Sequence, residues 1–167
     1  MNMPRRRFLT SSAAIAFCIS PVSQLVFAKE SPAVAALDKS ALIYLTPILS
    51  NGNESSCHGE VWFIHHEKEI FVVTQHDAWR AEAVRQGLNT AAIWIGEFGV
   101  WKSAKDRYRS APYLRISGQL EENTAVHAQV LEKFGEKYAD EWGSWGPRFR
   151  KGLADGSRVM LRYQPNS

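Results

Sequence analysis

Val61-Trp62-Phe63-Ile64 and, after a short polar turn, Ile70-Phe71-Val72-Val73-Thr74 are the two stretches that decide the fold of this chain. Branched and aromatic side chains dominate both stretches, and residues of these kinds favour strands. The turn between them, His65-His66-Glu67-Lys68-Glu69, is short and polar. Two strand-like runs joined in this way are typical of a β-hairpin. We therefore expect an antiparallel sheet that contains this hairpin.

The segments on either side of the hairpin predict further short strands interrupted by helices. Before it, the small and polar residues 29–37 predict a linker, and residues 38–49 predict a helix capped by Asp38 and interrupted at Pro47. After it, Asp77 starts a helix that ends at Gly87 in a left-handed cap. The remaining segments are a strand at 91–101, a charged segment at 102–110, a strand at 112–120, a helix from Asn123 or Thr124 to Ala139, an irregular segment at 141–156 and a strand at 157–163.

This order of elements predicts a mainly β, α+β fold. Each strand is short, and hairpins pair their strands antiparallel. A small sheet of this kind avoids unpaired edges by closing on itself, and the helices then pack outside it. We expect about five to six mostly antiparallel strands with flanking helices.

The N-terminal segment Pro4-Arg5-Arg6-Arg7-Phe8-Leu9-Thr10 has the pattern of a twin-arginine export signal. Small and apolar residues follow it up to Val26-Phe27-Ala28, which predicts cleavage after Ala28. Polar residues and a proline interrupt the apolar stretch, which therefore falls short of the roughly 20 apolar residues that a spanning helix needs. The predicted organisation is a signal peptide at 1–28, a linker at 29–37 and one domain at 38–167. We expect it in the periplasm or another extracytoplasmic space, without a stable membrane anchor after cleavage.

Removal of the signal changes the charge of the protein. The 167-residue chain has a formal net charge of +3, and residues 1–28 contain three arginines and no acid. The mature chain of 139 residues, which is 167 less 28, is therefore neutral. Neutrality removes the composition-based argument for nucleic acid as a partner. Of the two cysteines only Cys57 remains, so we expect a free thiol and no intrachain disulfide.

Three stretches of the predicted domain resemble the flavin-binding split-barrel families, that is, the pyridoxamine 5′-phosphate oxidase-like proteins and the deazaflavin-dependent reductases. Gly59–Ile64 with Glu69–Thr74 is similar to their first hairpin, Trp79-Arg80-Ala81 stands where their phosphate-contacting helix begins, and Tyr113–Glu121 is similar to the strand before their long helix. The likeness covers about residues 38–163. It implies a split β-barrel, a homodimer, a non-covalent FMN or deazaflavin, and hydride or electron transfer on a small molecule.

The resemblance also implies where a flavin would bind, since its phosphate needs cations with hydroxyl or amide donors and its ring needs an apolar slot. The families commonly carry Ser or Thr and Lys on the turn after the second strand, whereas the turn Gln75–Arg80 contains an acid. For Arg80 the other interpretation is a solvated charge, for Trp94 a core side chain, and for the Trp-rich segment 142–150 a barrel plug or a subunit interface. The expected cofactor-binding residues are Thr74, Arg80 and Lys102 for the phosphate, Gln75 and Trp79 on the adjoining turn, Trp94 and Trp101 for the ring, and Arg148 and Arg150 as a cover over an anionic ligand.

The histidines leave a second class of ligand open. No two of them have the spacing of metal ligands on one helix face, so we expect no metal site. An axial haem histidine stays possible, because some split-barrel relatives bind haem. The sequence singles out no catalytic residue. The alternatives to a flavin enzyme are a non-enzymatic module of the same fold, which binds haem or another planar ligand or has lost its cofactor, and an interaction protein that uses the Trp-rich segment.

Overall fold

The computed structural model of this chain describes residues 31–166. The predicted export signal at residues 1–28 lies outside them. The α-helices are α1 (Pro32–Leu37), α2 (Trp79–Arg85), α3 (Trp101–Ala104), α4 (Thr124–Lys137) and α5 (Ala139–Asp155), and η1 (Arg107–Ser110) is a 3₁₀ helix. The strands are β1 (Ile43–Pro47), β2 (Gly59–Val61), β3 (Ile64–His66), β4 (Glu69–Gln75), β5 (Thr90–Ile95), β6 (Tyr113–Glu121) and β7 (Arg158–Pro165).

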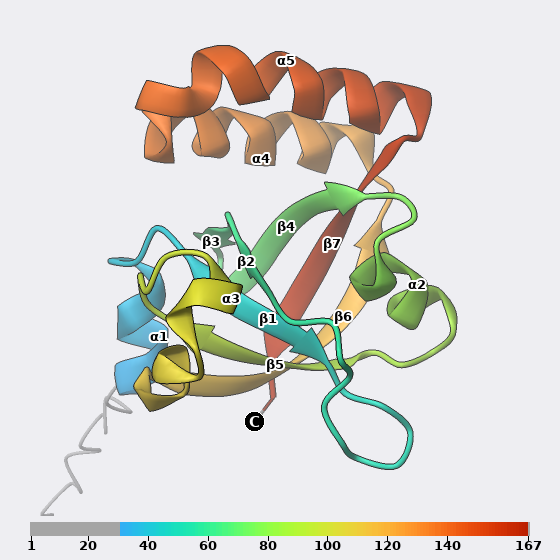
Figure 1. The fold of residues 1–167 in the computed structure, drawn as a ribbon. Helices are drawn as coiled ribbons and strands as arrows, with labels where there is room; N and C mark the ends of the chain where they lie inside the picture. The colour runs from blue at the N-terminus through green and yellow to red at the C-terminus, as the bar shows by residue number, and fades with distance from the viewer. Residues whose placement is uncertain (1–30, 167) are drawn as a thin grey trace, which may run out of the picture.

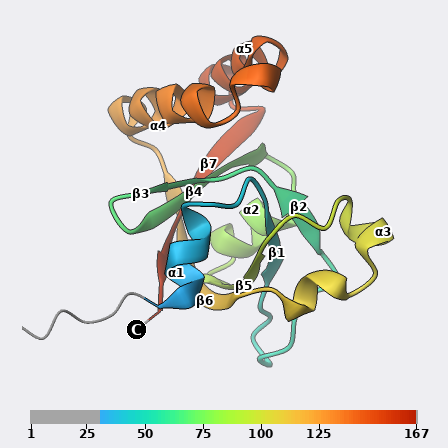
Figure 2. The ribbon, with the colours of Figure 1, turned by 90° about the vertical axis from the view of Figure 1, so that its left-hand side faces the viewer.

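One curled sheet contains all of these strands, in the order β2-β1-β5-β6-β7-β4-β3. Every neighbouring pair is antiparallel. The sheet bends into a half-barrel, and α4 and α5 lie side by side as a layer above it (Figures 1 and 2). The antiparallel α+β fold is confirmed. The described part of the chain has seven strands rather than five to six, and the sheet is not closed, because β2 and β3 remain as its two edges.

The main core fills the concave side of the sheet. Alternate residues of each strand point there, as the pleat of a strand requires. Ile70 and Val72 of β4, Ile93 of β5 and Leu161 of β7 are fully buried in it. Helix α1 adds Leu37, which has no exposed surface. The interior is therefore a packed apolar core.

Two further apolar clusters lie on the convex side of the sheet. Under α4 and α5, the strand residues Phe71 and Met160 pack against Phe134 and Phe149. The second cluster lies under α3 and η1. Its buried members are Tyr44, Ile48, Ala92, Trp94, Ala104 and Tyr108.

The predicted helix at 38–49 is wrong, because residues 43–47 form strand β1. All five residues of β1 are buried, with β2 on one side and β5 on the other. A strand that is covered on both faces is apolar at nearly every position, so its sequence also satisfies a helical spacing. The helix lies earlier, at α1, inside the segment that the sequence predicted as a linker.

The predicted irregular segment at 141–156 is also wrong, since residues 139–155 form α5 with Pro147 inside it. Gly146 precedes this proline and has no Cβ for the proline ring to clash with. Trp142 packs between Gly135 of α4 and Gly146, where added Cβ atoms would each lie 2.8 Å from its ring. Tertiary packing therefore holds together a helix that its own composition disfavours.

Most other predicted elements are confirmed. β3 and β4 form the expected hairpin, with Ile64 opposite Phe71. Helix α2 is followed by Gly87 at a φ of +80°, and Asn123 caps α4 through its side chain. Val61, however, belongs to the separate strand β2, which pairs with β1. The strand expected at 91–101 ends at Ile95, and Trp101 begins α3.

Candidate functional site

The opening of the half-barrel lies between β2 and the second half of β4. β3 pairs with β4 only as far as Phe71, so the later residues of β4 have β7 on one side and no strand on the other. Val61 of β2 and Val73 of β4 line one groove, which has a volume of about 380 Å³. A space of this size is in the range of small-molecule sites.

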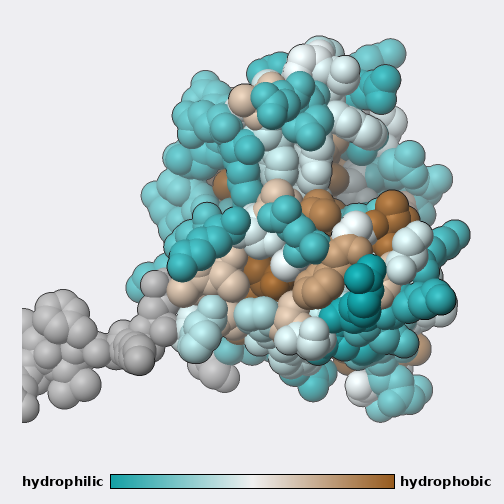
Figure 3. Space-filling view, turned by 60° about the vertical axis from the view of Figure 1, so that its left-hand side comes forward, coloured by the Kyte–Doolittle hydropathy of each residue, from teal (hydrophilic) through white to brown (hydrophobic). Residues whose placement is uncertain are grey.

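Aromatic side chains form the wall of this groove on the side of α5. The lining residues are Leu42, Glu60, Val61, Trp62, Val73, Trp145, Phe149 and Arg158. The helical layer above has a mostly hydrophilic outer surface, and apolar surface gathers on the barrel beneath it (Figure 3).

Trp62 is the most firmly held of these aromatic residues. Its ring stacks on Tyr138 with centroids 4.4 Å apart and planes 8° apart. The Tyr138 hydroxyl accepts the Phe63 N–H at 2.9 Å and lies 3.0 Å from the Ala41 carbonyl and 2.9 Å from the Phe63 carbonyl. Trp145 meets Trp62 edge-on at 5.9 Å. Stacking on a hydrogen-bonded tyrosine therefore holds Trp62 in the groove wall.

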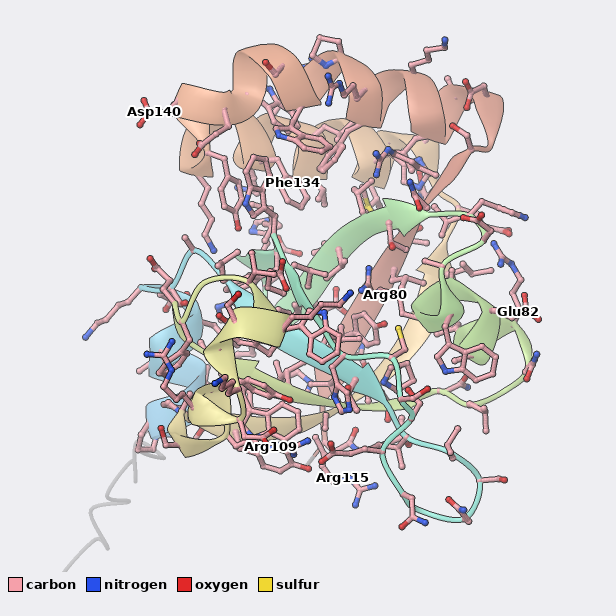
Figure 4. All side chains as sticks on the ribbon, in the orientation of Figure 1. Arg80, Glu82, Arg109, Arg115, Phe134 and Asp140 are labelled. Atoms are coloured by element: carbon pink, nitrogen blue, oxygen red, sulfur yellow. The ribbon has the colours of Figure 1, made fainter. Side chains whose placement is uncertain are left out.

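Arg80 is held by the same two strands, next to the groove residues. It reaches from α2 toward the barrel, whereas Glu82 of the same helix points away from it (Figure 4). Arg80 Nη1 donates to Thr74 Oγ1 at 2.9 Å, and a Cβ on Gly59 would lie 2.7 Å from Arg80 Nη2. Burial raises the pKa of Tyr163, and the positive charge of Arg80 acts in the opposite direction.

Among the described residues 31–166, no carboxylate neutralises the charge on Arg80. Within residues 31–166, Arg80 forms no ion pair within 4.0 Å, whereas Arg85, Arg109 and Arg162 each contact a carboxylate. Its Nε is buried and has no hydrogen-bond partner there. A half-buried guanidinium with an unsatisfied N–H is unfavourable on its own and favours an anionic ligand.

Of the predicted cofactor-binding residues, the structure brings Thr74 and Arg80 into direct contact. Gln75 is exposed at the end of β4, opposite Arg158 in β7. Trp79 is half-buried at the start of α2. These residues form one region at the end of β4.

The other predicted residues lie elsewhere. Trp94 and Trp101 belong to the convex cluster under α3, where Trp94 is buried against Tyr108, and Lys102 is exposed beside Trp101. Arg148 and Arg150 are exposed on α5 and lie over the rings of Trp145 and Trp142. Trp94 and Trp101 are therefore not among the residues that line the groove between the barrel and α5.

Trp62, Phe149 and Arg158 line the groove although their sequence context did not predict it. Phe149 lies in the Trp-rich segment 142–150, in which only Arg148 and Arg150 were predicted to contact a ligand. Trp62 was assigned to the hairpin. Arg158 follows a turn and starts a strand, and nothing in a sequence distinguishes such an arginine from a solvated one. Gly59 gave a usable signal, since a glycine in a strand indicates close approach of another group.

The histidines all have partners within the described residues. His58 contacts Thr46, His65 contacts Asp38, and the other three contact Gln129, Arg85 and the Glu121 carbonyl. In residues 31–166 no group of three or more His, Cys, Asp or Glu side chains is arranged to hold a metal ion. No helix of that region has the length and apolar character to cross a membrane.

Comparison with solved structures identifies the architecture. The fold is that of the split barrels. The chain is similar to HutZ, the haem storage protein of Vibrio cholerae, with a TM-score of 0.55 and 17% identity over 80% of this chain and 87% of that one. It is also similar to a pyridoxamine 5′-phosphate oxidase candidate from Listeria innocua, with a TM-score of 0.51 and 16% identity over 80% of this chain and 90% of that one. A third similar structure is the conserved protein Rv2991 of Mycobacterium tuberculosis, with a TM-score of 0.53 and 16% identity over 82% of this chain and 81% of that one.

No protein-family model and no curated protein matches the sequence. At these identities the likeness to other split barrels establishes the shared fold. The ligand has to be argued from the residues of this chain.

Proposed function

We propose that this chain is an exported split-barrel oxidoreductase that binds a flavin, FMN or a deazaflavin, and acts on a small molecule. The observation that carries the proposal is the unneutralised Arg80 at the opening of the barrel. Thr74 holds one end of its guanidinium, and Gly59 leaves it room. The phosphate of a flavin supplies the anion that this arginine lacks.

The residues of the opening fit such a group. The Nε of Arg80 is a buried donor without a partner in the described part of the chain, and Gly59 and Thr74 hold the guanidinium between two strands. The groove of about 380 Å³ offers aromatic walls at Trp62, on the same strand edge. A bound flavin would supply hydride or electron transfer. The chain's own part is to bind the phosphate, enclose the ring and exclude water.

Of the similar structures, one supports the proposed flavin function and one supports the alternative. The Listeria innocua protein is a candidate oxidase, which supports redox chemistry on this fold. HutZ is a haem storage protein, which supports the alternative of a binding module for haem or another planar ligand. The absorption spectrum of the protein purified from its native compartment separates these, because flavins and haem absorb at different wavelengths. A colourless protein that stays colourless after incubation with FMN would contradict the flavin function, and one that also stays colourless after incubation with haem would contradict the haem alternative.

Titration of the apoprotein with FMN and with riboflavin tests the role of Arg80. Arg80→Ala removes charge-assisted hydrogen bonds worth about 1.5–3 kcal/mol each, so the Kd for FMN should rise by about 10- to 100-fold. The Kd for riboflavin, which has no phosphate, should change little. Gly59→Ala should act in the same direction, because its Cβ displaces the guanidinium. Arg85→Ala is the matched control on the same helix, since Arg85 already contacts Glu82 and His76. Equal FMN affinity of wild type and Arg80→Ala would reject the phosphate role.

Export and dimerisation are parts of the proposal that rest on the sequence. The pair Arg5-Arg6 with Phe8-Leu9 supports export by the twin-arginine pathway. The double substitution Arg5→Lys and Arg6→Lys keeps the charge and should retain the protein in the cytoplasm, as cell fractionation would measure. Sedimentation equilibrium of the mature chain measures its oligomeric state, and a monomer at micromolar concentration would refute the homodimer.

A further inference from the structure

A second arginine, Arg158, lies beside the groove at the start of β7. It lines the groove together with Trp145 and Phe149. It also lines a separate open pocket of about 450 Å³, whose other lining residues are Gln75, His76, Asp77, Gly156 and Ser157. Arg158 therefore stands at the boundary between the two spaces, where the β4–α2 turn meets the α5–β7 turn.

The position of Arg158 is fixed by its surroundings. A Cβ on the buried Gly152 would lie 2.6 Å from both Arg158 Cγ and Cδ, so this glycine leaves room for the side chain. The guanidinium carbon lies 5.2 Å from the Phe149 ring centroid and 6.0 Å from that of Trp145. An arginine held against aromatic faces keeps its charge and its orientation at the same time.

Arg158 has no carboxylate partner within 4.0 Å among residues 31–166. The nearest acid along the chain, Asp155, already accepts from the Ser157 N–H at 3.0 Å and the Ser157 hydroxyl at 2.6 Å. The carboxylate of Asp155 is thus occupied within the turn, and within residues 31–166 it does not neutralise the charge of Arg158.

The opposite wall of the pocket supplies further polar groups. Arg85 Nη2 lies 2.9 Å from His76 Nδ1, and because arginine can only donate, this nitrogen accepts. A neutral His76 therefore carries its proton on Nε2 as a donor. Asp77 lines the same pocket and has no ion pair within 4.0 Å in the described residues. The pocket thus offers Arg158 and the N–H donor of His76 to one negative group. The carboxylate of Asp77 repels a second negative group and can accept a hydrogen bond from a hydroxyl or an amine.

We propose that this pocket is the substrate subsite, in which Arg158 binds the carboxylate of a small hydroxy- or amino-carboxylate and Asp77 accepts from its hydroxyl or amino group. The assignment as a substrate site rests on the proposed flavin function, because the pocket opens beside the groove assigned to the ring. Arg80 and Arg158 lie on opposite faces of the sheet: Thr74, which contacts Arg80, packs on the concave side, and Arg158 contacts α5 on the convex side. The two anion sites are therefore separate.

Titration of the ¹⁵N-labelled mature chain with lactate, followed by amide chemical shifts, tests the subsite. Shifts should concentrate at residues 75–77 and 156–158. Propionate, which lacks the hydroxyl, should bind several-fold more weakly, and lactamide, which lacks the charge, at least 10-fold more weakly. Arg158→Gln should raise the Kd for lactate at least 10-fold. Asp77→Asn should abolish the preference for lactate over propionate.

Arg148→Gln is the matched control. Arg148 lies 5.1 Å over the same Trp145 ring but is exposed and lines neither space, so the variant should bind lactate as the wild type does. Equal affinity for lactate and lactamide, or equal effects of the two arginine substitutions, would overturn the proposal.

A repeat of the titration in the presence of FMN distinguishes this proposal from the proposed function. Lactate should still shift residues 156–158 in the presence of FMN, because the phosphate of the cofactor and the carboxylate of lactate use different arginines, although Arg158 also borders the groove assigned to the ring. Displacement of lactate by FMN would overturn the separate subsite while supporting flavin binding. If FMN does not bind but lactate shifts residues 156–158, the flavin function fails and the anion site stands.

Discussion

Substitution of Gly118 by alanine is the sharpest test of the packing around the barrel interior. Gly118 of β6 pairs with Tyr163 of β7, and the tyrosine ring lies across the glycine. A Cβ at position 118 would lie 2.5 Å from Tyr163 Cδ1 and closer still to Cε1. Tyr163 is 1% exposed, so the ring has no free space to move into.

The size of the effect follows from this geometry. Carbon atoms in contact normally lie about 3.5–4.0 Å apart, so the added methyl group overlaps the ring by about 1 Å or more. Overpacking of a closely packed interior costs about 1–3 kcal/mol. At about 2–4 °C per kcal/mol for a domain of this size, Gly118→Ala should lower the Tm by about 2–12 °C.

Thermal and urea unfolding of the mature chain measure this loss. Gly143→Ala is the matched control: Gly143 is exposed on α5, has nothing within 4 Å of an added Cβ, and should gain up to about 1 kcal/mol from helix propensity. In the double variant with Tyr163→Leu, the cost of Gly118→Ala should fall by at least about 1 kcal/mol, because the clash is removed. A Gly118→Ala protein as stable as the wild type, or additive effects in the double variant, would refute the reasoning.

Three further predictions concern single interactions. Tyr138→Phe should cost about 1–3 kcal/mol, because it leaves the buried Phe63 N–H without an acceptor; an unchanged urea midpoint would contradict this. Arg109 holds the pKa of Glu54 below its usual 4.5, so this pair stabilises the fold above that pH and loses its effect as the pH falls through the lowered pKa. Arg109→Gln should accordingly cost up to about 1 kcal/mol more at pH 7 than below that pKa, where the contacts of Arg109 with the Trp94 and Tyr108 rings remain, as unfolding at a series of pH values measures. Pro147→Ala restores a helical N–H donor inside α5 and should raise the unfolding free energy by about 1–2 kcal/mol; a lower Tm would show that the proline is favourable there.

The sequence predicted the elements whose patterns admit one interpretation. The hairpin β3–β4 is marked by branched and aromatic residues on both sides of a short polar turn. Asn123 marks the start of α4, because a side-chain acceptor at that position satisfies a helix N–H. Gly87 marks the end of α2 through its positive φ. In each of these cases the local chemistry and the tertiary environment favour the same structure.

The errors occurred where the tertiary environment opposes the local pattern. β1 is covered on both faces, which removes the alternation that identifies a strand. α5 contains a proline and glycines, yet it forms because Trp142, Trp145 and Phe149 bury themselves against α4 and the sheet. The sequence also did not predict which strands pair when they are not joined by a hairpin turn. Strand β2, for example, pairs with β1 and not with β4.

The sequence by itself determined the antiparallel α+β architecture, the resemblance to split barrels, and the contact region of Thr74 and Arg80, because these depend on residue type and short spacing. Only the tertiary structure decided which aromatic residues line a groove and which arginines remain without a carboxylate. Burial and charge neutralisation depend on residues far apart in the chain, as Gly59 with Arg80 and Gly152 with the convex face of β7 show. The candidate site is therefore a property of the folded sheet. The surroundings of Arg158, which are Gly152, Phe149 and Trp145, come together only in the tertiary structure.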